Sequence, residues 1–516
     1  MNLLQWARWE VLLLGLVPIY LTRTIYRLYL HPLAKFPGPR LTATTSLYEV
    51  YHDIIRGRRF VWEIEKMHEK YGPIVRITPN ELHIKDSSFY HEIYTSAPRK
   101  RNKDPNFVGL FGSPTSMIAS VDHDHHRFRR GILGHLFSKR SINNISPLIH
   151  AKVQRLMERL EQFRNDDRVV HLSAAFVALA ADIITSYSYG ESCNFLDDET
   201  FRSDVRDAII ETEELDHITR LYPFVLTVLH YIPLCLFAAI KPATAIMARV
   251  QKRVAEKSAS VIRATESGKS KGTLFDALTD PHIPASERTP SRIHDEGMIL
   301  LSGGTEPAAN ALTVAAFHII RNKDILSNMR TEIEDSGIED LNTASLAELE
   351  QLPYLTAVIN EAVRLSHGLT IRTPRIAPNE TLKYEDYIIP AKAHPLPRIS
   401  MSSYFVHMDP AIFPNPTSFN PNRWEETRKR GDNISQFITS FGKGSRQCIG
   451  INLAYADLYF TLASFATSFD YELHDTTEAS VRVALDRGVP FPETGHFMVK
   501  ARVVGRFRSP TGERTL

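Results

Sequence analysis

One stretch near the C-terminus constrains the fold of this chain more than any other: residues 441–450, Phe-Gly-Lys-Gly-Ser-Arg-Gln-Cys-Ile-Gly. Cys448 ends a glycine-rich loop, and an apolar segment with helical spacing follows it, formed by Ile449, Leu453, Ala456, Phe460 and Ala463. A helix N-terminus lowers the pKa of a thiol, and glycines let backbone N–H groups approach a sulfur closely. The pattern predicts a buried thiolate with its donors in place, as in proteins that hold haem iron through sulfur.

The loop matches Phe-x-x-Gly-x-Arg-x-Cys-x-Gly at all five defined positions, and in this it resembles the haem signature of the cytochrome P450 family. The resemblance implies a mainly α fold with small β-sheets and an N-terminal membrane anchor. It also implies that Cys448 is the proximal iron ligand of haem b and that Arg446 pairs with a haem propionate. The alternative explanation is a buried structural cysteine beside a turn.

Size and composition fit one large core and a reducing compartment. The chain has 516 residues, of which 43% are hydrophobic, and its net charge of +2 gives no argument for nucleic-acid binding. The three cysteines, Cys193, Cys235 and Cys448, form no disulfide framework, which fits a compartment facing the cytosol. Cys235 lies in an apolar run and is interpreted as a small core residue.

An apolar run at residues 11–22 has three explanations: a signal anchor, a cleaved signal peptide or a buried helix. No small-residue cleavage site follows it, as a signal peptide would require. Arg23, Arg27, Lys35 and Arg40 follow it, against Arg8 before it, so the positive-inside rule places the main body in the cytoplasm. We therefore predict a membrane anchor over residues 1–30, in the endoplasmic reticulum.

The proline-rich stretch 31–40 is predicted to be an extended hinge, and it resembles the linker of microsomal fungal P450s. The catalytic domain is then expected to span residues 41–516. A second apolar stretch, Leu221 to Val250, is either plain core or, as the family resemblance implies, the roof of the substrate pocket and a contact with the bilayer.

Glu361 and Arg364 carry opposite charges on one face of a helix that is apolar nearly all round. Such a helix is expected to be buried, and buried charges need partners, so Arg423 is the natural third member. The three resemble the family's Glu-x-x-Arg and Pro-x-Arg triad, which holds the cysteine loop in place. A surface ion pair is the alternative.

Residues 121–130 contain three histidines and three arginines, which naively suggest a metal site. The family has Trp-x-x-x-Arg here, and both residues bind a haem propionate. In this chain His126 stands in place of the tryptophan and Arg130 matches the arginine, and an imidazole N–H can donate as an indole does. The resemblance also makes Arg375, in Thr-Pro-Arg, a propionate ligand.

The segment Gly303-Gly304-Thr305-Glu306-Pro307 departs from the family pattern, Ala/Gly-Gly-x-Asp/Glu-Thr. The resemblance implies that Glu306 relays protons, whereas Pro307 replaces the threonine whose hydroxyl orients dioxygen. Proline lacks a hydroxyl and an N–H and crowds the carbonyl four residues earlier, so the helix is expected to kink at the oxygen groove. Water, Thr305 or a substrate hydroxyl would then complete the relay.

The resemblance covers nearly the whole chain and is strongest to trichodiene-oxygenase-like enzymes of fungal secondary metabolism. It implies an NADPH-dependent monooxygenase that hydroxylates or epoxidises a hydrophobic terpenoid or polyketide. Electrons would come from a separate NADPH-cytochrome P450 reductase, with cytochrome b5 as a further partner. Two other functions stay open: a haem-thiolate isomerase or dehydratase, which Pro307 permits, and a haem-binding protein without catalysis.

Overall fold

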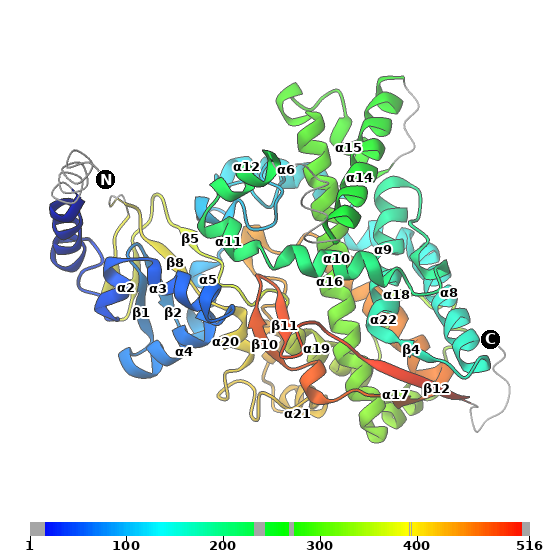
Figure 1. Cartoon of the computed structure of the whole chain (residues 1–516). Helices are drawn as coiled ribbons and strands as arrows, with labels where there is room; N and C mark the ends of the chain where they lie inside the picture. The colour runs from blue at the N-terminus through cyan, green and yellow to red at the C-terminus, as the bar shows by residue number, and fades with distance from the viewer. Residues whose placement is uncertain (1–15, 232–242, 268–272, 392, 394, 508–516) are drawn as a thin grey trace, which may run out of the picture. The chain divides into compact units, whose positions relative to one another are not determined.

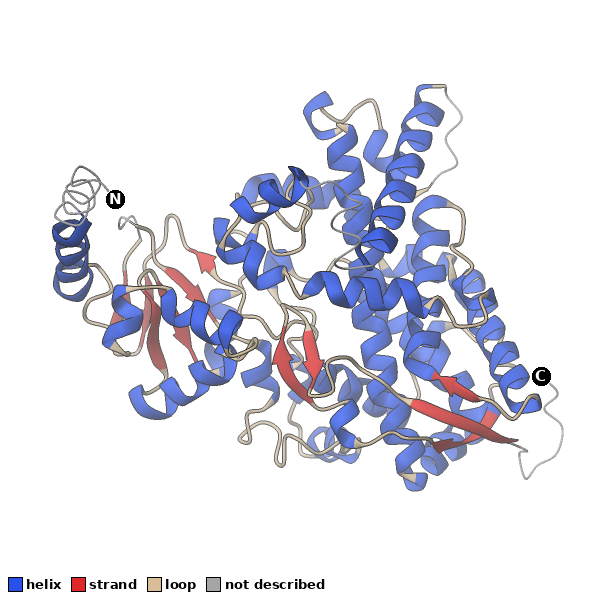
Figure 2. Ribbon diagram, in the orientation of Figure 1, coloured by secondary structure: helices blue, strands red, loops and turns tan. Residues whose placement is uncertain are grey.

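The structure is a computed structural model, and it describes residues 16–231, 243–267, 273–391, 393 and 395–507 (Figure 1). The chain forms two compact units, one from residues 1–104 and 372–402 and the other from residues 105–371 and 403–516. The first combines a five-stranded sheet with several short helices, whereas helices dominate the second (Figure 2). The expected mainly α fold with small sheets is confirmed.

The first unit is built around a five-stranded sheet of order β1-β2-β8-β5-β3. β1 and β2 form an antiparallel hairpin in which Ile74 pairs with Ile84, and β8 adds parallel to β2. Arg372 ties the returning chain to the N-terminal part, because its buried guanidinium donates to Glu81 (2.7 Å) and Glu49 (2.6 Å). The elements are α2 (Arg40–Thr44), α3 (Leu47–Val50), α4 (Phe60–Tyr71), α5 (Tyr90–Ile93), β1 (Ile74–Thr78), β2 (Glu81–Ile84), β3 (Asn102–Lys103), β5 (Arg375–Ile376), β6 (Leu382–Tyr384), β7 (Tyr387–Ile389) and β8 (Arg398–Ser400).

The second unit packs its helices beside two small sheets, β4-β12-β9 and β10-β11. Its helices are α6 (His123–Gly134), α7 (Lys139–Asn144), α8 (Ser146–Asn165), α9 (Leu172–Tyr189), α10 (Ser203–Glu213), α11 (Asp216–Leu221), α12 (Phe224–Tyr231), α14 (Ala243–Glu266), α15 (Leu274–Thr279), α16 (Pro290–Arg321), α17 (Lys323–Asp335), α18 (Leu346–Leu349), α19 (Pro353–Ser366), α20 (Ser403–His407), α21 (Asn422–Lys429) and α22 (Ile451–Ser468). Its strands are β4 (Val169–His171), β9 (Phe469–Leu473), β10 (Val483–Asp486), β11 (Pro490–Pro492) and β12 (Lys500–Arg506).

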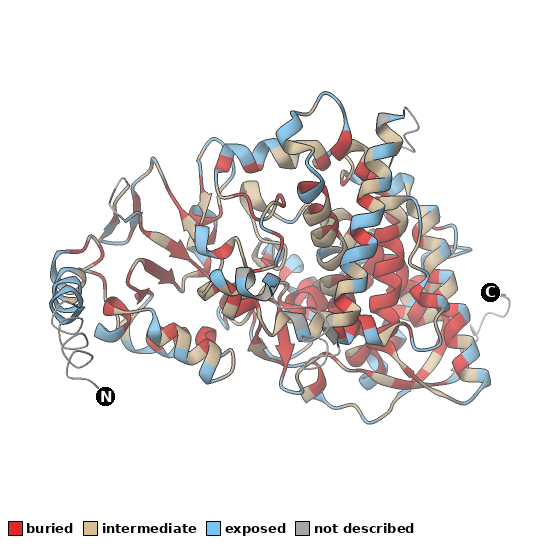
Figure 3. Ribbon diagram, turned by 45° about the horizontal axis from the view of Figure 1, so that its top comes forward, coloured by how far each residue is buried: buried red, intermediate tan, exposed pale blue. Residues whose placement is uncertain are grey.

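The long helix α16 is the central element of this unit. It starts at Thr289, whose hydroxyl accepts the Arg292 N–H (3.3 Å), and Pro290 occupies the first turn, where a missing N–H costs nothing. It packs against α9, α14, α19 and α22. Among the described residues, α9 is the helix long and apolar enough to span a membrane, and 83% of it is buried. Figure 3 shows that buried residues are concentrated in the helices of the second unit. A helix that is apolar all round and enclosed by its neighbours is a core helix.

The proline-rich stretch differs from the extended hinge that its sequence predicts. Its first half is turned, because the Ala34 N–H donates to the His31 carbonyl (2.8 Å) and the Phe36 N–H to that of Leu33 (3.2 Å). The turn buries Leu33 completely, and this burial outweighs the extended bias of the prolines. The segment then lies along β1, where Pro37 accepts the backbone N–H of Arg76 (2.7 Å).

The two apolar stretches are described only in part. Residues 16–25 are helical and expose Leu16, Ile19, Tyr20, Leu21 and Ile25. Residues 1–15, the first half of the predicted anchor, lie outside the described residues, as do residues 232–242 with Cys235. In the second stretch α12 exposes Phe224, Val228 and Tyr231. The described parts of both stretches therefore present apolar side chains at the surface.

Candidate active site

The cysteine loop folds back on itself just before α22. The Cys448 N–H donates to the Phe441 carbonyl (2.8 Å) and the Gln447 N–H to that of Gly444 (3.1 Å). Gly442 and Gly444 take left-handed φ values of 63° and 73°, which other residues adopt only with strain. The two glycines thus allow the tight return that brings Cys448 to the start of α22.

The Cys448 thiol lies at the end of this loop, just before the start of α22. The protein atoms around it raise its pKa, while the Gly450 N–H and the Arg130 guanidinium oppose that rise by favouring the thiolate. A soft sulfur with an N–H donor and a nearby cation suits a metal–thiolate bond, because metal binding replaces the thiol proton. The donor set therefore fits a haem iron.

Two arginines lock the cysteine loop to α6. Arg130 of α6 donates to the Gln447 carbonyl (2.6 Å). In the other direction Arg446 donates to the carbonyls of Ser120 (2.7 Å) and Val121 (2.8 Å), just before that helix. The structure thus brings Arg130, Arg446 and Cys448 together, as the sequence predicts.

The other two predicted propionate ligands lie on different elements. His126 is buried on α6, one turn before Arg130, so both side chains project from the same face of the helix. Arg375 lies in β5 of the first unit, where its guanidinium stacks over the Tyr94 ring (5.2 Å) and donates to the Pro374 carbonyl (3.1 Å). The propionate roles of all four residues stay predictions.

The Gly303–Pro307 segment belongs to α16, and the helix continues through Pro307. Because proline lacks an N–H, the Gly303 carbonyl has no helical partner four residues later. Gly303 is exposed and a Cβ there would meet no atom within 4 Å, whereas a Cβ on Gly304 would lie 2.7 Å from Ile184 of α9. Gly304 therefore permits close helix packing, and Gly303 leaves accessible space beside α16. The kink at Pro307 stays a prediction.

Glu306 has a partner that the sequence does not reveal, Glu213 at the end of α10. The two carboxyl groups hydrogen-bond each other, and Asn310 also bonds Glu306. Burial raises the pKa of both, and the neighbouring Glu306 raises that of Glu213 further, to well above its usual range. Arg206 favours charge on Glu306, so Glu213 is the more readily protonated of the two. Two carboxyls in contact cannot both ionise.

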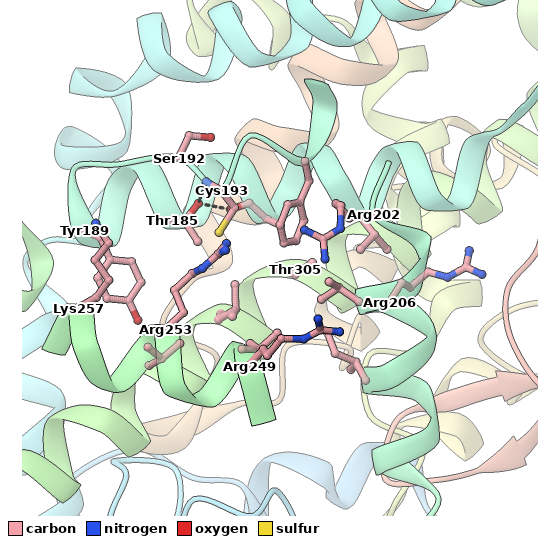
Figure 4. Close-up of a pocket in the computed structure, with 18 of the residues that line it drawn as sticks. Thr185, Tyr189, Ser192, Cys193, Arg202, Arg206, Arg249, Arg253, Lys257 and Thr305 are labelled. Atoms are coloured by element: carbon pink, nitrogen blue, oxygen red, sulfur yellow. Dashed lines mark hydrogen bonds between the residues drawn. The ribbon is translucent and has the colours of Figure 1, made fainter. Parts of the chain in front are cut away.

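Thr305 does not join this pair. Its side chain lines a cavity between α9, α10, α14 and α16, and Cys448 is not among the lining residues (Figure 4). Adjacent residues of a helix point in directions about 100° apart, so Thr305 and Glu306 lie on different faces of α16. The structure therefore brings Glu306 to Glu213 and does not bring Thr305 to Cys448.

The predicted charge triad is confirmed as buried. Arg364 donates twice to Glu361 (2.7 and 3.0 Å), and Arg423 donates to the same carboxylate (3.1 Å). The Trp424 indole (3.0 Å) and the Asn420 backbone N–H (2.9 Å) add two more bonds. Glu361 and Arg364 are fully buried, so the surface-pair alternative is wrong.

The end of α19 connects this triad to the cysteine loop. The Ser440 hydroxyl donates to the Val363 carbonyl (2.7 Å). Gly368 follows α19 with a left-handed φ of 67°, and a Cβ there would lie 2.2 Å from the Ser440 carbonyl oxygen. This close backbone approach requires glycine, and it fixes the start of the loop against α19.

A buried histidine pair holds the same end of the loop and was not predicted. His407 Nε2 accepts the Thr439 N–H (2.9 Å), so its proton lies on Nδ1, which donates to His367 Nδ1 (3.3 Å). Burial lowers the pKa of His367 to about 3 and that of His407 well below its usual range. Both imidazoles are therefore neutral and act as fixed supports.

Known proteins match this architecture over most of the chain. The sequence model of the family described as Cytochrome P450 matches residues 39–493. The chain is 41% identical to Cytochrome P450 monooxygenase TRI4 of Fusarium sporotrichioides, over 92% of this chain and 91% of that protein. It is 42% identical to Conidiogenone synthase PchP450 of Penicillium rubens, over 98% of this chain and 100% of that protein.

A solved structure agrees in fold. Retinoic acid bound cyanobacterial CYP120A1 superposes with a TM-score of 0.65 at 19% identity, covering 89% of this chain and 96% of that one. At this identity the likeness concerns the fold alone. The family match over residues 39–493 includes the cysteine loop, α16 and the buried triad. The chain therefore belongs to the cytochrome P450 family of monooxygenases.

Proposed function

We propose that this monooxygenase binds haem b through Cys448 and hydroxylates or epoxidises a hydrophobic secondary metabolite, with electrons from NADPH through a separate reductase. The observation that carries the proposal is the mutual lock between the cysteine loop and α6, because it holds the sulfur beside Gly450 and Arg130. Bound haem would supply the iron chemistry that activates dioxygen.

The chain's own residues would hold the haem at both its iron and its edge. Cys448 offers the sulfur, and Gly450 stabilises negative charge on it. His126, Arg130, Arg375 and Arg446 are proposed to face the propionates, where guanidinium groups form strong charge-assisted bonds. Of these, Arg130 and Arg446 already brace the loop through main-chain carbonyls, so they would serve both the loop and the haem.

Proton delivery is proposed to run through the Glu213–Glu306 pair. A carboxyl that keeps its proton at neutral pH is a usable general acid, and the pair shares one proton between α10 and α16. The pair offers an exchangeable proton close to the position where the family has its threonine hydroxyl. Glu213 is therefore proposed to compensate for Pro307.

The substrate class is proposed from the relatives. The fungal proteins most similar to this chain include an enzyme named for the synthesis of conidiogenone. This supports a secondary metabolite, and a terpenoid or polyketide with a largely apolar skeleton fits a membrane enzyme. The exposed apolar residues from Leu16 to Ile25 support an anchor in the endoplasmic reticulum membrane, where the reductase and cytochrome b5 would meet the enzyme.

The membrane part of this proposal has a direct test. The full-length protein should sediment with microsomes, and deletion of residues 1–27 should weaken this strongly, with residual binding through the apolar face of α12. A full-length protein found wholly in the soluble fraction would refute the anchor.

Labelled dioxygen tests the reaction itself. Cells that carry the reductase and a candidate metabolite should yield a product with one labelled oxygen atom, and turnover should require NADPH. Full conversion under argon without NADPH would instead establish an isomerase or dehydratase. A protein that binds haem and converts no candidate under either condition would fit a non-catalytic role.

A further inference from the structure

The second cavity, as we call it to distinguish it from the proposed haem site, lies in the helical unit, and Cys448 does not line it. It has a volume of about 500 Å³ and lies between α9, α10, α14 and α16 (Figure 4). A volume of this size suits a small organic ligand. Because Thr305 is the one residue that it shares with the predicted catalytic set, the cavity is separate from the proposed iron site.

The walls of this cavity are mostly apolar. Its lining includes Val177, Ala181, Val205, Ile209, Val250 and Leu301. One buried polar group interrupts them: Thr305 is 3% exposed, and its hydroxyl has no hydrogen-bond partner in the described part of the chain. A buried hydroxyl without a partner costs free energy.

The charged side chains that line the cavity are mostly cationic. Four arginines and Lys257 line it, against a single carboxylate, Glu191. Three of the cations pair with carboxylates: Arg202 with Asp204, Arg206 with Asp207 and Lys257 with Glu191.

Arg249 and Arg253 are different, since no carboxylate of the described residues forms an ion pair with either. Both lie on α14, one helical turn apart, and Figure 4 shows the Arg253 guanidinium directed toward Cys193. Cys193 itself is held in place by its N–H, which donates to the Thr185 hydroxyl (3.1 Å). Arg249 and Arg253 therefore give the lining of the cavity two positive charges in excess of its acids.

A mostly apolar lining beside two arginines that form no ion pair with a described carboxylate matches one kind of ligand. We propose that this cavity binds an amphipathic carboxylate, with its alkyl chain among the apolar walls and its carboxylate on Arg249 and Arg253. Guanidinium groups bind carboxylates through paired N–H donors, and burial of the chain adds the hydrophobic contribution. Free fatty acids and anionic membrane lipids share this chemistry. The site goes beyond the proposed monooxygenase function and does not depend on it.

Dodecanoate is the probe, and calorimetry on the full-length haem-loaded protein is the measurement. Wild-type protein should bind dodecanoate and bind dodecanol about tenfold more weakly or worse, because one charge-assisted bond is worth at least that factor. Arg249→Gln combined with Arg253→Gln should weaken dodecanoate by about 10- to 100-fold. Lys252→Gln is the matched control, since Lys252 lies on α14 between them, is 78% exposed and does not line the cavity; its effect should stay below about twofold.

A second variant tests the interior. Val250→Trp fills part of the cavity and should abolish binding of dodecanoate while the haem absorption spectrum stays that of the wild type. Equal affinity in the double arginine variant, or unchanged binding in Val250→Trp, overturns the proposal. Dodecanoate that shifts the haem spectrum equally in wild type and the double variant also overturns it, because the carboxylate then binds beside the haem.

Vesicles separate the two sources of the ligand. Phosphatidylcholine vesicles doped with phosphatidylserine should bind no more tightly to wild type than to the double arginine variant if free fatty acids are the occupants. A loss of vesicle binding in the double variant, together with its loss of dodecanoate affinity, supports the same site with a membrane lipid as the source.

Discussion

Replacing Glu361 by glutamine should strongly destabilise the folded protein, although it exchanges only one carboxylate oxygen for an amide nitrogen. The carboxylate receives five donors: two from Arg364 and one each from Arg423, Trp424 and Asn420. Glutamine keeps the shape, but it removes the charge and turns one acceptor into a donor that faces other donors. Two buried guanidinium groups then lack a counter-ion.

Loss of one member of a buried ion pair costs about 3–5 kcal/mol, a large share of the roughly 5–15 kcal/mol that stabilises a typical protein. Glu361→Gln should therefore lower the urea midpoint sharply and yield little haem-loaded protein. Glu425→Gln is the control, because Glu425 pairs with Lys429 at the surface (2.9 Å) and should cost at most about 0.5 kcal/mol. Urea unfolding followed by circular dichroism, with haem content in parallel, measures both. Equal midpoints for the two variants would refute the structural role of the triad.

Three further predictions concern protons and the helix at Pro307. Burial lowers the pKa of His68 to about 4, so between pH 4 and 6.5 the folded state binds fewer protons than the unfolded state. The free energy of unfolding should therefore fall by roughly 3 kcal/mol as pH falls from about 6.5 to 4. His68→Gln should reduce this pH dependence in urea unfolding, and an unchanged pH dependence would contradict the lowered pKa of His68. Glu213→Leu should lower the protonated-carboxyl absorption in the infrared spectrum, to which buried Asp457 also contributes, and should slow product formation by about 10²-fold. Exposed Glu211→Leu should do neither, and an absorption equal to that of the wild type in Glu213→Leu would contradict a protonated Glu213. Pro307→Thr should lower the share of NADPH electrons lost as hydrogen peroxide, and an unchanged or larger share would show that the Glu213–Glu306 pair already supplies what the hydroxyl would.

The sequence was most informative where chemistry and spacing are local. Cys448 could be predicted because glycines, an arginine and a helix start lie within ten residues of it. Glu361 and Arg364 could be predicted to be buried because their helix is apolar all round, and a buried charge must find a partner. These inferences need no knowledge of distant parts of the chain.

Long-range pairings were beyond such reasoning. Glu213 lies in an acidic stretch that resembles a solvated helix end, and only the approach of α10 to α16 makes it the partner of Glu306. His367 and His407 are ordinary residues in the sequence, and their shared proton follows from tertiary packing. The turn at residues 31–36 escaped prediction because complete burial of Leu33 outweighs proline stiffness.

The central claim is that the Cys448 sulfur binds the haem iron, and the spectrum of the reduced carbon monoxide complex tests it most directly. The purified wild-type protein should absorb at the long-wavelength position that gives the P450 family its name. Cys448→Ala should abolish that band, while a Cys193→Ala control should keep it, since Cys193 lines the second cavity. A Cys448→Ala protein that retains the band would contradict the ligand assignment, and with it the account of the site.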